Sequence, residues 1–260
     1  MKHLIIGDAH VKPGQSLERF EWLAKFCIEH KPDVIVDLGD WEDMPSLSSY
    51  DIGKKSYEGR SYVADIESAR QARILFQRGL EEFNESCRKR HTKGYYPTKI
   101  ALGGNHFEGR INRAIELDRK LEGLINIHDG AAIEFGWDYI PFLEPVAISG
   151  IMYSHYFTSG VMGRAISGEH PGYGLVTKQH CTCVQGHSHL LDMTSRTKPN
   201  GDRIWGIHAG CFLAEDQWED YAGPANKMWS RGILLLDNVH EGDFDSFTWT
   251  SVNRLKELYG

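Results

Sequence analysis

The segment Leu4-Ile5-Ile6-Gly7-Asp8-Ala9-His10 begins with a run of large apolar residues and ends, past a glycine, in two polar side chains. Three further segments repeat this arrangement: Val34-Ile35-Val36 leads to Gly39-Asp40, Ile100-Ala101-Leu102 leads to Gly104-Asn105-His106, and Cys183-Val184 leads to Gly186-His187-Ser188-His189. Short apolar runs bounded by glycine are typical of buried parallel strands. Functional side chains in open α/β sheets follow the carboxyl ends of such strands. We therefore expect these polar residues to meet at one edge of a sheet.

The region between the first two apolar runs has the pattern of a crossover helix. Its apolar residues recur at spacings of three and four, at Phe20, Leu23, Ala24, Cys27 and Ile28. That periodicity predicts one buried helix face. Lys31-Pro32-Asp33 ends the helix and leads into the second run, so residues 1–40 are predicted to form a β-α-β unit.

Residues 41–95 separate the second run from the third, which is a longer interval than a simple crossover needs. A polar stretch comes first, and an apolar stripe at helical spacing then predicts one long amphipathic helix from about Val63 to Cys87. We expect a helical and loop insertion over 41–95, with a cap near the site as one role for it. Its basic residues, among them Arg70, Arg78 and Lys89, are interpreted as a solvated face balanced by glutamates rather than as a nucleic-acid surface.

The second half of the chain changes to a pattern of short strands. After a helix expected at about 111–121, strands are predicted at 132–135, 146–148, 151–153, 203–207, 232–236 and 247–249. A parallel first half and a largely antiparallel second half predict two sheets packed together. With no repeat and no linker, residues 1–260 are expected to form a single domain.

Composition narrows the class of protein. The chain has 41% hydrophobic and 25% charged residues, as ordinary globular proteins do. Its formal net charge of -7 argues against unselective nucleic-acid binding through a basic surface. Two bound divalent cations would bring that charge to -3, so a nucleic-acid substrate stays open.

No apolar stretch approaches the roughly 18 residues of a membrane span, so no membrane partner is expected. If Asp8 has a function, no signal peptide can be removed ahead of it. The five cysteines show no paired C-x-x-C spacing and are interpreted as reduced thiols, which predicts a cytoplasmic protein, in the host cytoplasm if the gene belongs to a phage.

The polar residues that follow the apolar runs are of the types that bind metal ions. Carboxylate and amide oxygens mixed with imidazoles suit Mn²⁺, Fe or Zn²⁺ better than Ca²⁺ or a thiolate-bound metal. His187 and His189 lie two residues apart, so both side chains can face one cavity. The alternatives are a strand-end turn without metal for Asp8 and His10, and a helix N-cap for Asp40. Taken together, the segments predict a metal-dependent hydrolase.

The order of these segments, with a lone His155 after a predicted strand, resembles the calcineurin-like metallophosphoesterase superfamily. All five family blocks occur in order between residues 8 and 189, and the chain is similar to compact bacterial or phage members, including the branch related to DNA-repair exonucleases. The resemblance implies a four-layer α/β/β/α sandwich of two mixed β-sheets flanked by helices.

The resemblance also implies two divalent metal ions, Mn²⁺ first, with Fe, Zn²⁺ or Ni²⁺ as alternatives. One would be held by Asp8, His10, Asp40 and His189, and the other by Asp40, Asn105, His155 and His187. Asp40 would bridge the two ions, a hydroxide between them would attack phosphorus, and His106 would steady the transition state or protonate the leaving oxygen. His128, His170, His180 and His208 compete with His155 for its place.

The chain departs from the family pattern beside the Asn-His pair. The family has an acidic residue directly after that pair, whereas here Phe107 precedes Glu108. Asp43, three residues after Asp40, is a candidate for the supporting acidic role.

Two arginines are candidates for binding the substrate. Arg110 lies near Asn105-His106 and could hold a phosphate through two hydrogen bonds, or form a surface ion pair instead. Arg164 lies in a glycine-rich stretch after His155 and is the second candidate. The aromatic residues Trp205, Phe212, Trp218, Tyr221 and Trp229 are interpreted as packing rather than as a base-stacking platform.

The reaction expected from these residues is hydrolysis of a phosphate ester, most simply a phosphodiester, with nucleic acid as the first candidate substrate and a nuclease activity as its form. The alternatives are a cyclic nucleotide or another small phosphodiester, then a phosphomonoester or phosphoprotein. A non-catalytic interaction module on the same fold is the alternative outside enzymes. Neither the oligomeric state nor the physiological metal follows from the sequence.

Overall fold

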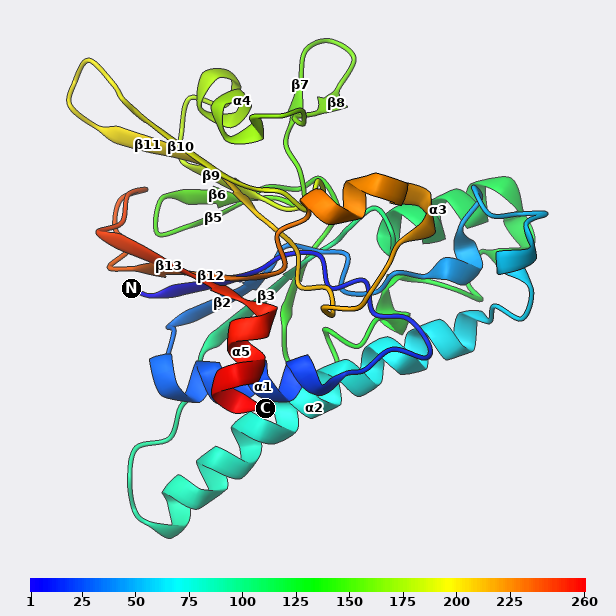
Figure 1. Ribbon diagram of the computed structural model, residues 1–260, viewed down its shortest axis with the longest axis horizontal. Helices are drawn as coiled ribbons and strands as arrows, with labels where there is room; N and C mark the ends of the chain where they lie inside the picture. The colour runs from blue at the N-terminus through cyan, green and yellow to red at the C-terminus, as the bar shows by residue number, and fades with distance from the viewer.

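The structure is a computed structural model that describes residues 1–260, and it has four layers (Figure 1). Helices α1 (Glu18–His30), α2 (Tyr62–Lys89) and α5 (Val252–Tyr259) cover one face of a six-stranded sheet. A five-stranded sheet packs on the other face and carries α4 (Pro171–Lys178) on its outer side. The predicted α/β/β/α sandwich of two mixed sheets is thereby confirmed.

The first sheet has the strand order β13-β12-β1-β2-β3-β4. Its strands are β1 (His3–Ile6), β2 (Val34–Asp37), β3 (Thr98–Leu102), β4 (Asp138–Ile140), β12 (Gly232–Asp237) and β13 (Ser246–Ser251). Strands β1 to β4 run parallel to one another. Strand β12 pairs antiparallel with β1, and β13 pairs antiparallel with β12. The carboxyl ends of β1, β2 and β3 therefore lie at the same edge.

The second sheet has the order β10-β11-β9-β6-β5. Its strands are β5 (Val146–Ile148), β6 (Ile151–Tyr153), β9 (Cys183–Gln185), β10 (Leu191–Thr197) and β11 (Arg203–Ala209). Strands β6, β9 and β11 are parallel to one another. A small hairpin of β7 (Thr158–Ser159) and β8 (Arg164–Ala165) extends from the α4 side of the molecule (Figure 1).

Strand β1 lies in the middle of the molecule and is buried on both faces. Leu4 and Ile6 pack in the core beneath the helices, whereas Ile5 packs in the core between the sheets. Successive side chains of a strand point to opposite faces, so a strand covered on both sides must be apolar at every position. This is why the run at residues 4–6 shows no alternation.

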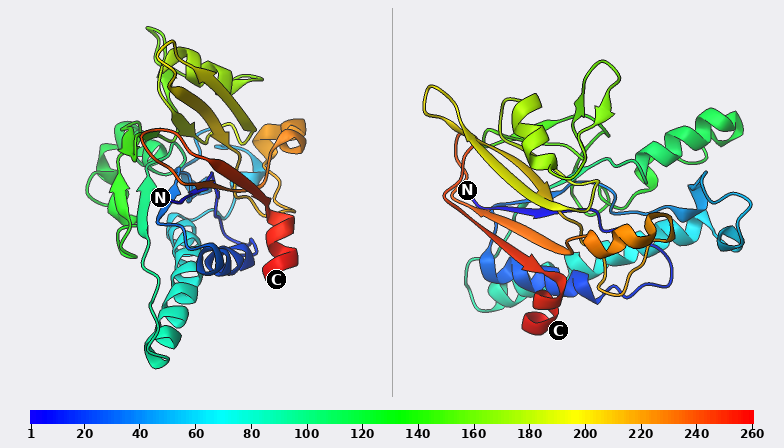
Figure 2. Two further views of the ribbon diagram at one scale, coloured as in Figure 1. Left: turned by 90° about the vertical axis from the view of Figure 1, so that its left-hand side faces the viewer. Right: turned by 45° about the horizontal axis from the view of Figure 1, so that its top comes forward.

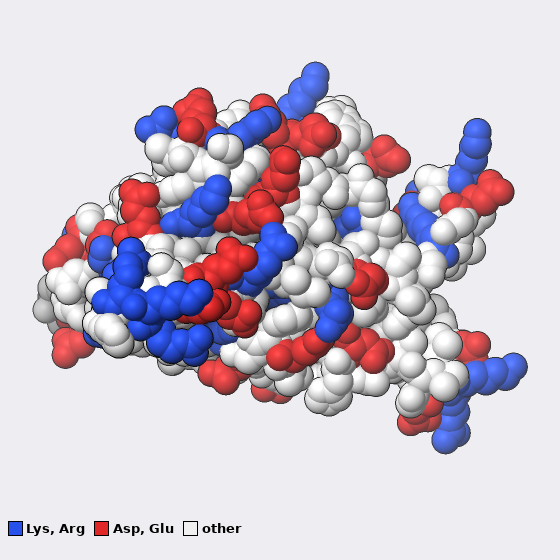
Figure 3. All heavy atoms as spheres, turned by 90° about the horizontal axis from the view of Figure 1, so that it is seen from below, with Lys and Arg blue, Asp and Glu red and all other residues white.

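The helix predicted in the insertion is confirmed as α2. It packs along α1 and extends beyond the end of α1 (Figure 2). Its exposed arginines and lysine form ion pairs, including Arg70 with Glu134, Arg78 with Glu21 and Lys89 with Glu85. Acidic and basic side chains intermingle over this face (Figure 3), as predicted for a solvated surface.

The residues before α2, 44–61, which we call the insertion loop, contain the short turns η1 (Pro45–Leu47) and η2 (Lys55–Tyr57). That residues 41–95 cap the site stays a prediction.

Two expectations about the remaining elements are wrong in detail. Residues 132–135 form turns, with Phe135 N–H donating to Ala131 O, and the strand begins only at Asp138. Helix α3 (Glu108–Leu117) starts and ends earlier than expected, and η3 (Arg119–Leu121) and η4 (Ile127–Asp129) follow it. Strands β12 and β13, from the second half of the chain, return to the first sheet. No helix combines the length and hydropathy needed to span a bilayer.

Candidate metal centre

Five strand ends, three from the first sheet and two from the second, bring the predicted site residues together. Asp8 and His10 follow β1, Asp40 follows β2, Asn105 and His106 follow β3, His155 follows β6, and His187 and His189 follow β9. Because all five strands are parallel within their sheets, the loops after them meet at one end of the sandwich.

The structure places ligand atoms of six of these residues in three overlapping groups, each within 4.8 Å, and neither Asn105 nor His187 belongs to any of them. The groups are Asp8 with His10 and His189, His10 with Asp40 and His106, and Asp8 with Asp40 and His155. Nε2 of His155 lies 3.2 Å from Oδ2 of Asp40 and 2.8 Å from Oδ1 of Asn105. Nε2 of His189 lies 2.9 Å from Oδ2 of Asp8. Asp8 and Asp40 thus each belong to two of the groups.

His187 and His189 lie in two different parts of this cluster. The His187 ring centroid is 5.3 Å from that of His155, whereas the His189 ring centroid is 4.9 Å from that of His10. The expected assignment of the two histidines to two different ions stays a prediction. Of the histidines considered for the position of His155, His155 is the one that lies in the cluster. His128, His170 and His180 are exposed, and Nδ1 of His208 contacts Oγ of Ser188 instead.

The backbone at this cluster is strained. His10, Asp40, His187 and His189 have φ of 43°, 52°, 68° and 61°, in the left-handed region that residues with a side chain rarely adopt. Each such residue costs about 1–3 kcal/mol, and residues of this kind concentrate at functional sites. The loops are therefore held in a geometry that aims these side chains inward at the expense of stability.

Buried polar atoms in the cluster lack hydrogen-bond partners, which fits a bound cation. These atoms are Oδ2 of Asp8, both ring nitrogens of His10 and Nδ1 of His189, all in side chains that are at most 3% exposed. The contact between Asp8 and His189 is close but does not have hydrogen-bond geometry. Buried polar atoms without partners are rare because they cost free energy. A divalent metal would give these oxygen and nitrogen atoms a common partner.

His155, which follows β6, is oriented as a metal-binding imidazole would be. Nδ1 of His155 donates to the backbone carbonyl of Leu38 at 2.9 Å, which leaves Nε2 facing Asn105 and Asp40. A metal-binding histidine is usually fixed by such a hydrogen bond from its other nitrogen.

Two glycines leave space for the carboxylates. A Cβ built at Gly104 would overlap Asp40, and one built at Gly186 would overlap Oδ1 of Asp8. The same oxygen of Asp8 accepts a hydrogen bond from the backbone N–H of His187 at 3.1 Å. The glycines that precede Asn105 and His187 therefore permit the close approach of the loops to the two aspartates.

Electrostatics favour the protonation states that a metal requires at Asp40, His187 and His189, whereas they favour the protonated form of His155. Burial opposes ionisation of Asp40, but the facing imidazoles of His155 and His106 hold the pKa of that carboxyl well below its usual range. Burial lowers the pKa of His187 to about 4 and also lowers the pKa of His189. For His155 burial acts in the same direction, but the Asp40 carboxylate outweighs it and raises the pKa to about 9. Ionised aspartates and neutral imidazoles are the forms that bind metals.

His106 is held beside the cluster by two aspartates. Its Nδ1 lies 2.6 Å from Oδ1 of Asp43, and its backbone N–H donates to Oδ1 of Asp40 at 2.8 Å. Its ring centroid lies 4.2 Å from that of His10. Asp43 thus occupies the supporting position expected for it, whereas Glu108 accepts hydrogen bonds from Tyr139 and Phe142 instead.

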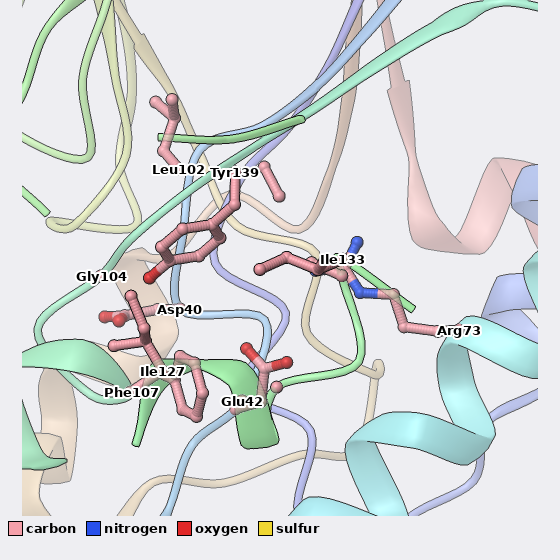
Figure 4. A pocket seen from close by; sticks show the side chains of 12 residues that line it. Asp40, Glu42, Arg73, Leu102, Gly104, Phe107, Ile127, Ile133 and Tyr139 are labelled. Carbon is pink, nitrogen blue, oxygen red and sulfur yellow. The ribbon is translucent and has the colours of Figure 1, made fainter. Parts of the chain in front are cut away.

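The loop that carries Asp40 is supported from behind by a buried ion pair. Nη2 of Arg73 on α2 lies 2.6 Å from Oδ2 of Asp37, and Oδ1 of Asp37 accepts from the N–H of Gly39 at 3.0 Å. The guanidinium also lies 3.8 Å from the Trp41 ring centroid. Figure 4 shows Arg73 with Asp40 and Glu42 around a small internal cavity.

The two predicted substrate arginines lie in different surroundings. Nη1 of Arg110 donates to the carbonyls of Asp43 and Met44 at 2.5 and 3.0 Å, and the side chain borders a groove beside His106. Arg164 is exposed on β8 and has no ion-pair partner. Neither residue belongs to the metal-ligand groups, and a role in binding substrate stays a prediction for both.

Residues 213–230 also contribute to the site, and nothing in the sequence pattern predicts this contribution. Nζ of Lys12 lies 2.7 and 2.6 Å from the two carboxylate oxygens of Glu219, and the Trp229 ring centroid lies 4.2 Å from that of His189. The first contact joins residues 207 positions apart and the second joins residues 40 positions apart, so no local spacing could have revealed them.

Comparison with known proteins adds a likeness in structure only. No family model matches the chain, and no curated protein matches it. Yfce, a phosphoesterase from E. coli, has a TM-score of 0.40 and 13% identity, covering 95% of this chain and 98% of that chain. The nuclease MPE of Pseudomonas putida has a TM-score of 0.35 and 16% identity, covering 87% and 86%. At these values neither activity is carried over to this chain.

Proposed function

We propose that the chain is a metal-dependent phosphoesterase that binds two divalent cations, with Mn²⁺ as the first candidate. The observation that carries this proposal is the set of buried, unpartnered ligand atoms of Asp8, His10 and His189 immediately beside His106. The proposed ligands of one ion are Asp8, His10, Asp40 and His189, and those of the other are Asp40, Asn105, His155 and His187. Asp40 is shared because its carboxylate faces both His10 and His155.

Bound metal ions would supply positive charge to the phosphoryl oxygens and lower the pKa of an attacking water. The remaining requirement is a proton for the leaving oxygen. Because Nδ1 of His106 faces Asp43, its Nε2 is the nitrogen left for the substrate. We assign His106 the role of proton donor to the leaving group, and Asp43 the role of holding its ring in place.

The substrate class that we propose is a phosphodiester, with nucleic acid as the first candidate. His106 borders a groove that extends away from the metal centre, and a phosphodiester carries a second organic substituent that needs such space. A cyclic nucleotide, another small phosphodiester and a phosphomonoester are the competing outcomes.

Hydrolysis of bis-p-nitrophenyl phosphate and p-nitrophenyl phosphate tests the reaction, with Mn²⁺, Fe²⁺, Zn²⁺ or Ni²⁺ added to metal-free protein. We expect metal-dependent turnover of the diester, and its loss in Asp40→Asn. The exposed Asp202→Asn serves as the matched control, because it removes a carboxylate outside the site. Absence of turnover of either ester with all four metals would overturn the proposed function.

A further inference from the structure

A groove of about 820 Å³ opens beside His106, on the side of Asp43 and Arg110. Most of its lining comes from two segments far apart in the sequence, the insertion loop and the residues from Trp218 into η5 (Asp220–Met228). Figures 1 and 2 show both segments at the end of the molecule where α3 lies. We call this cavity the His106 groove. Its volume falls in the range of small-ligand sites.

Three aromatic side chains line the His106 groove and expose their rings. Tyr50 is 80% exposed, Trp218 is 50% exposed and Tyr221 is 58% exposed. Tyr50 belongs to the insertion loop, whereas Trp218 and Tyr221 come from the other wall-forming segment. The exposure of Trp218 and Tyr221 does not fit the packing role expected for them from the sequence. The Tyr221 ring centroid lies 6.1 Å from that of His106, so the aromatic surface begins beside the proposed proton donor. Exposed aromatic rings along a groove provide faces on which a planar base can stack.

The charges of the groove do not suit a continuous polyanion. Six acidic and four basic side chains line it, so the lining is net acidic. The four basic groups already have carboxylate neighbours: Lys12 pairs with Glu219, Lys54 and Arg60 pair with Asp51, and Arg110 lies 3.6 Å from Asp43. Glu58 and Asp220 have no ion-pair partner. A strand that continued through the groove would meet no free cation for its further phosphates.

We propose that the His106 groove binds one nucleoside, the leaving group of the phosphoester, and that Tyr50, Trp218 and Tyr221 provide the surface for its base. This inference rests on the proposed function. Water forms the new P–O bond, and the P–O bond to the nucleoside breaks. The proton that the attacking water gives up passes through Nε2 of His106 to the leaving oxygen, so the nucleoside leaves as an alcohol. The substrate is then a short nucleotide or a strand end rather than the interior of a strand.

Binding of the leaving nucleoside is the first test, because it needs no turnover. Isothermal titration of the metal-free chain with adenosine is expected to show binding, and titration with ribose is expected to show none. Tyr50→Ala and Trp218→Ala should each weaken adenosine binding by about fivefold or more, since stacking of one base contributes roughly 1–3 kcal/mol. Tyr173→Ala is the matched control, because that tyrosine is 62% exposed on α4 and lies outside the groove. Absence of adenosine binding, or binding that both groove variants leave unchanged, would overturn the inference.

Turnover by the Mn²⁺-loaded chain is the second test. A dinucleoside monophosphate should have a lower KM than the analogue that lacks the base of the leaving nucleoside, and Trp218→Ala should remove this difference. The affinity for a single-stranded oligonucleotide should fall with salt as expected for about one phosphate contact. A slope that requires several phosphates would show that the groove holds a strand and would contradict the inference.

The two proposals fail in different ways. Turnover of bis-p-nitrophenyl phosphate without adenosine binding would refute the nucleoside groove and leave the phosphoesterase standing. Adenosine binding without metal-dependent turnover of any ester would refute the phosphoesterase, and the groove would then be a nucleoside-binding site.

Discussion

Nδ1 of His106 faces Oδ1 of Asp43 at 2.6 Å, and both side chains are buried at the inner end of the His106 groove. Asp43 belongs to the loop after β2, whereas His106 belongs to the loop after β3. Burial opposes ionisation of Asp43, but the hydrogen bond with His106 outweighs it and lowers the pKa of that carboxyl. An ionised carboxylate therefore accepts from Nδ1–H, which fixes the orientation of the ring.

Asp43→Asn should lower kcat by about 10- to 100-fold, because an amide no longer holds the ring as a carboxylate does. The metal content should stay at the wild-type level, since Asp43 is outside the proposed ligand set. Steady-state kinetics and elemental analysis of the same preparation check both points. A variant that lost its metal would show that Asp43 acts on the cations instead.

His106→Ala should affect substrates according to their leaving groups. An ester of a nucleoside needs a proton on its leaving oxygen, so kcat for such a substrate should fall by about 10²- to 10⁴-fold. p-Nitrophenolate leaves readily without a proton, so the decrease in kcat for a p-nitrophenyl ester should be much smaller. Comparison of kcat for the two substrates measures the difference, and equal losses would assign His106 to steadying the phosphoryl group rather than to proton transfer.

Mn²⁺ should stabilise the folded chain, because the buried atoms of Asp8, His10 and His189 then have a partner. A metal at 100 times its Kd adds about 2.7 kcal/mol to the free energy of unfolding. Calorimetric melting with increasing Mn²⁺ should therefore raise Tm for the wild type and for Asp202→Asn. Asp8→Asn should shift far less, and an equal shift in that variant would place the metal elsewhere.

Gly186→Ala should impair metal binding without unfolding the chain. The added methyl would overlap Oδ1 of Asp8, which is held by the N–H of His187. Gly109→Ala is the control, because a Cβ there makes only ordinary contacts. Metal content and the circular dichroism spectrum measure the effect, and full metal content in Gly186→Ala would contradict the close fit of this loop to Asp8.

His3 should make folding sensitive to acid. Burial and the neighbouring amino-terminal charge lower the pKa of His3 to about 4, and its Nδ1 lies 2.7 Å from Oη of Tyr153. Below pH 6.5 the unfolded chain takes up a proton that the folded chain does not, so stability falls as the pH drops from 6.5 towards 4. Between pH 7 and 5 this group should contribute a loss of about 2 kcal/mol.

Chemical unfolding at the two pH values tests this assignment in the wild type and in His3→Gln. The variant should lose less stability between pH 7 and 5, because glutamine does not titrate there. The exposed His91→Gln should lose as much as the wild type. If His3→Gln did so too, the acid sensitivity would come from other groups.

Local pattern was enough to predict the strands that carry the site. The runs at residues 4–6, 34–36 and 100–102 became β1, β2 and β3 because uninterrupted apolar residues fit a strand buried on both faces. Residues 132–135 misled the same reasoning. The apolar side chains there belong to turns in which Ala131 and Ala132 are buried, and burial alone does not distinguish a strand from a turn.

The sequence by itself determined which polar residues follow the strand ends, because ligand types and apolar runs are local properties of the chain. Parallel strands then had to bring Asp8, Asp40 and His106 to one edge. Only the tertiary structure decided how the cluster is completed: that β12 and β13 return to the first sheet, that Lys12 pairs with Glu219, and that Tyr50 shares a groove with Trp218. These relationships depend on packing between segments up to about two hundred residues apart, and no periodicity along the chain records such contacts.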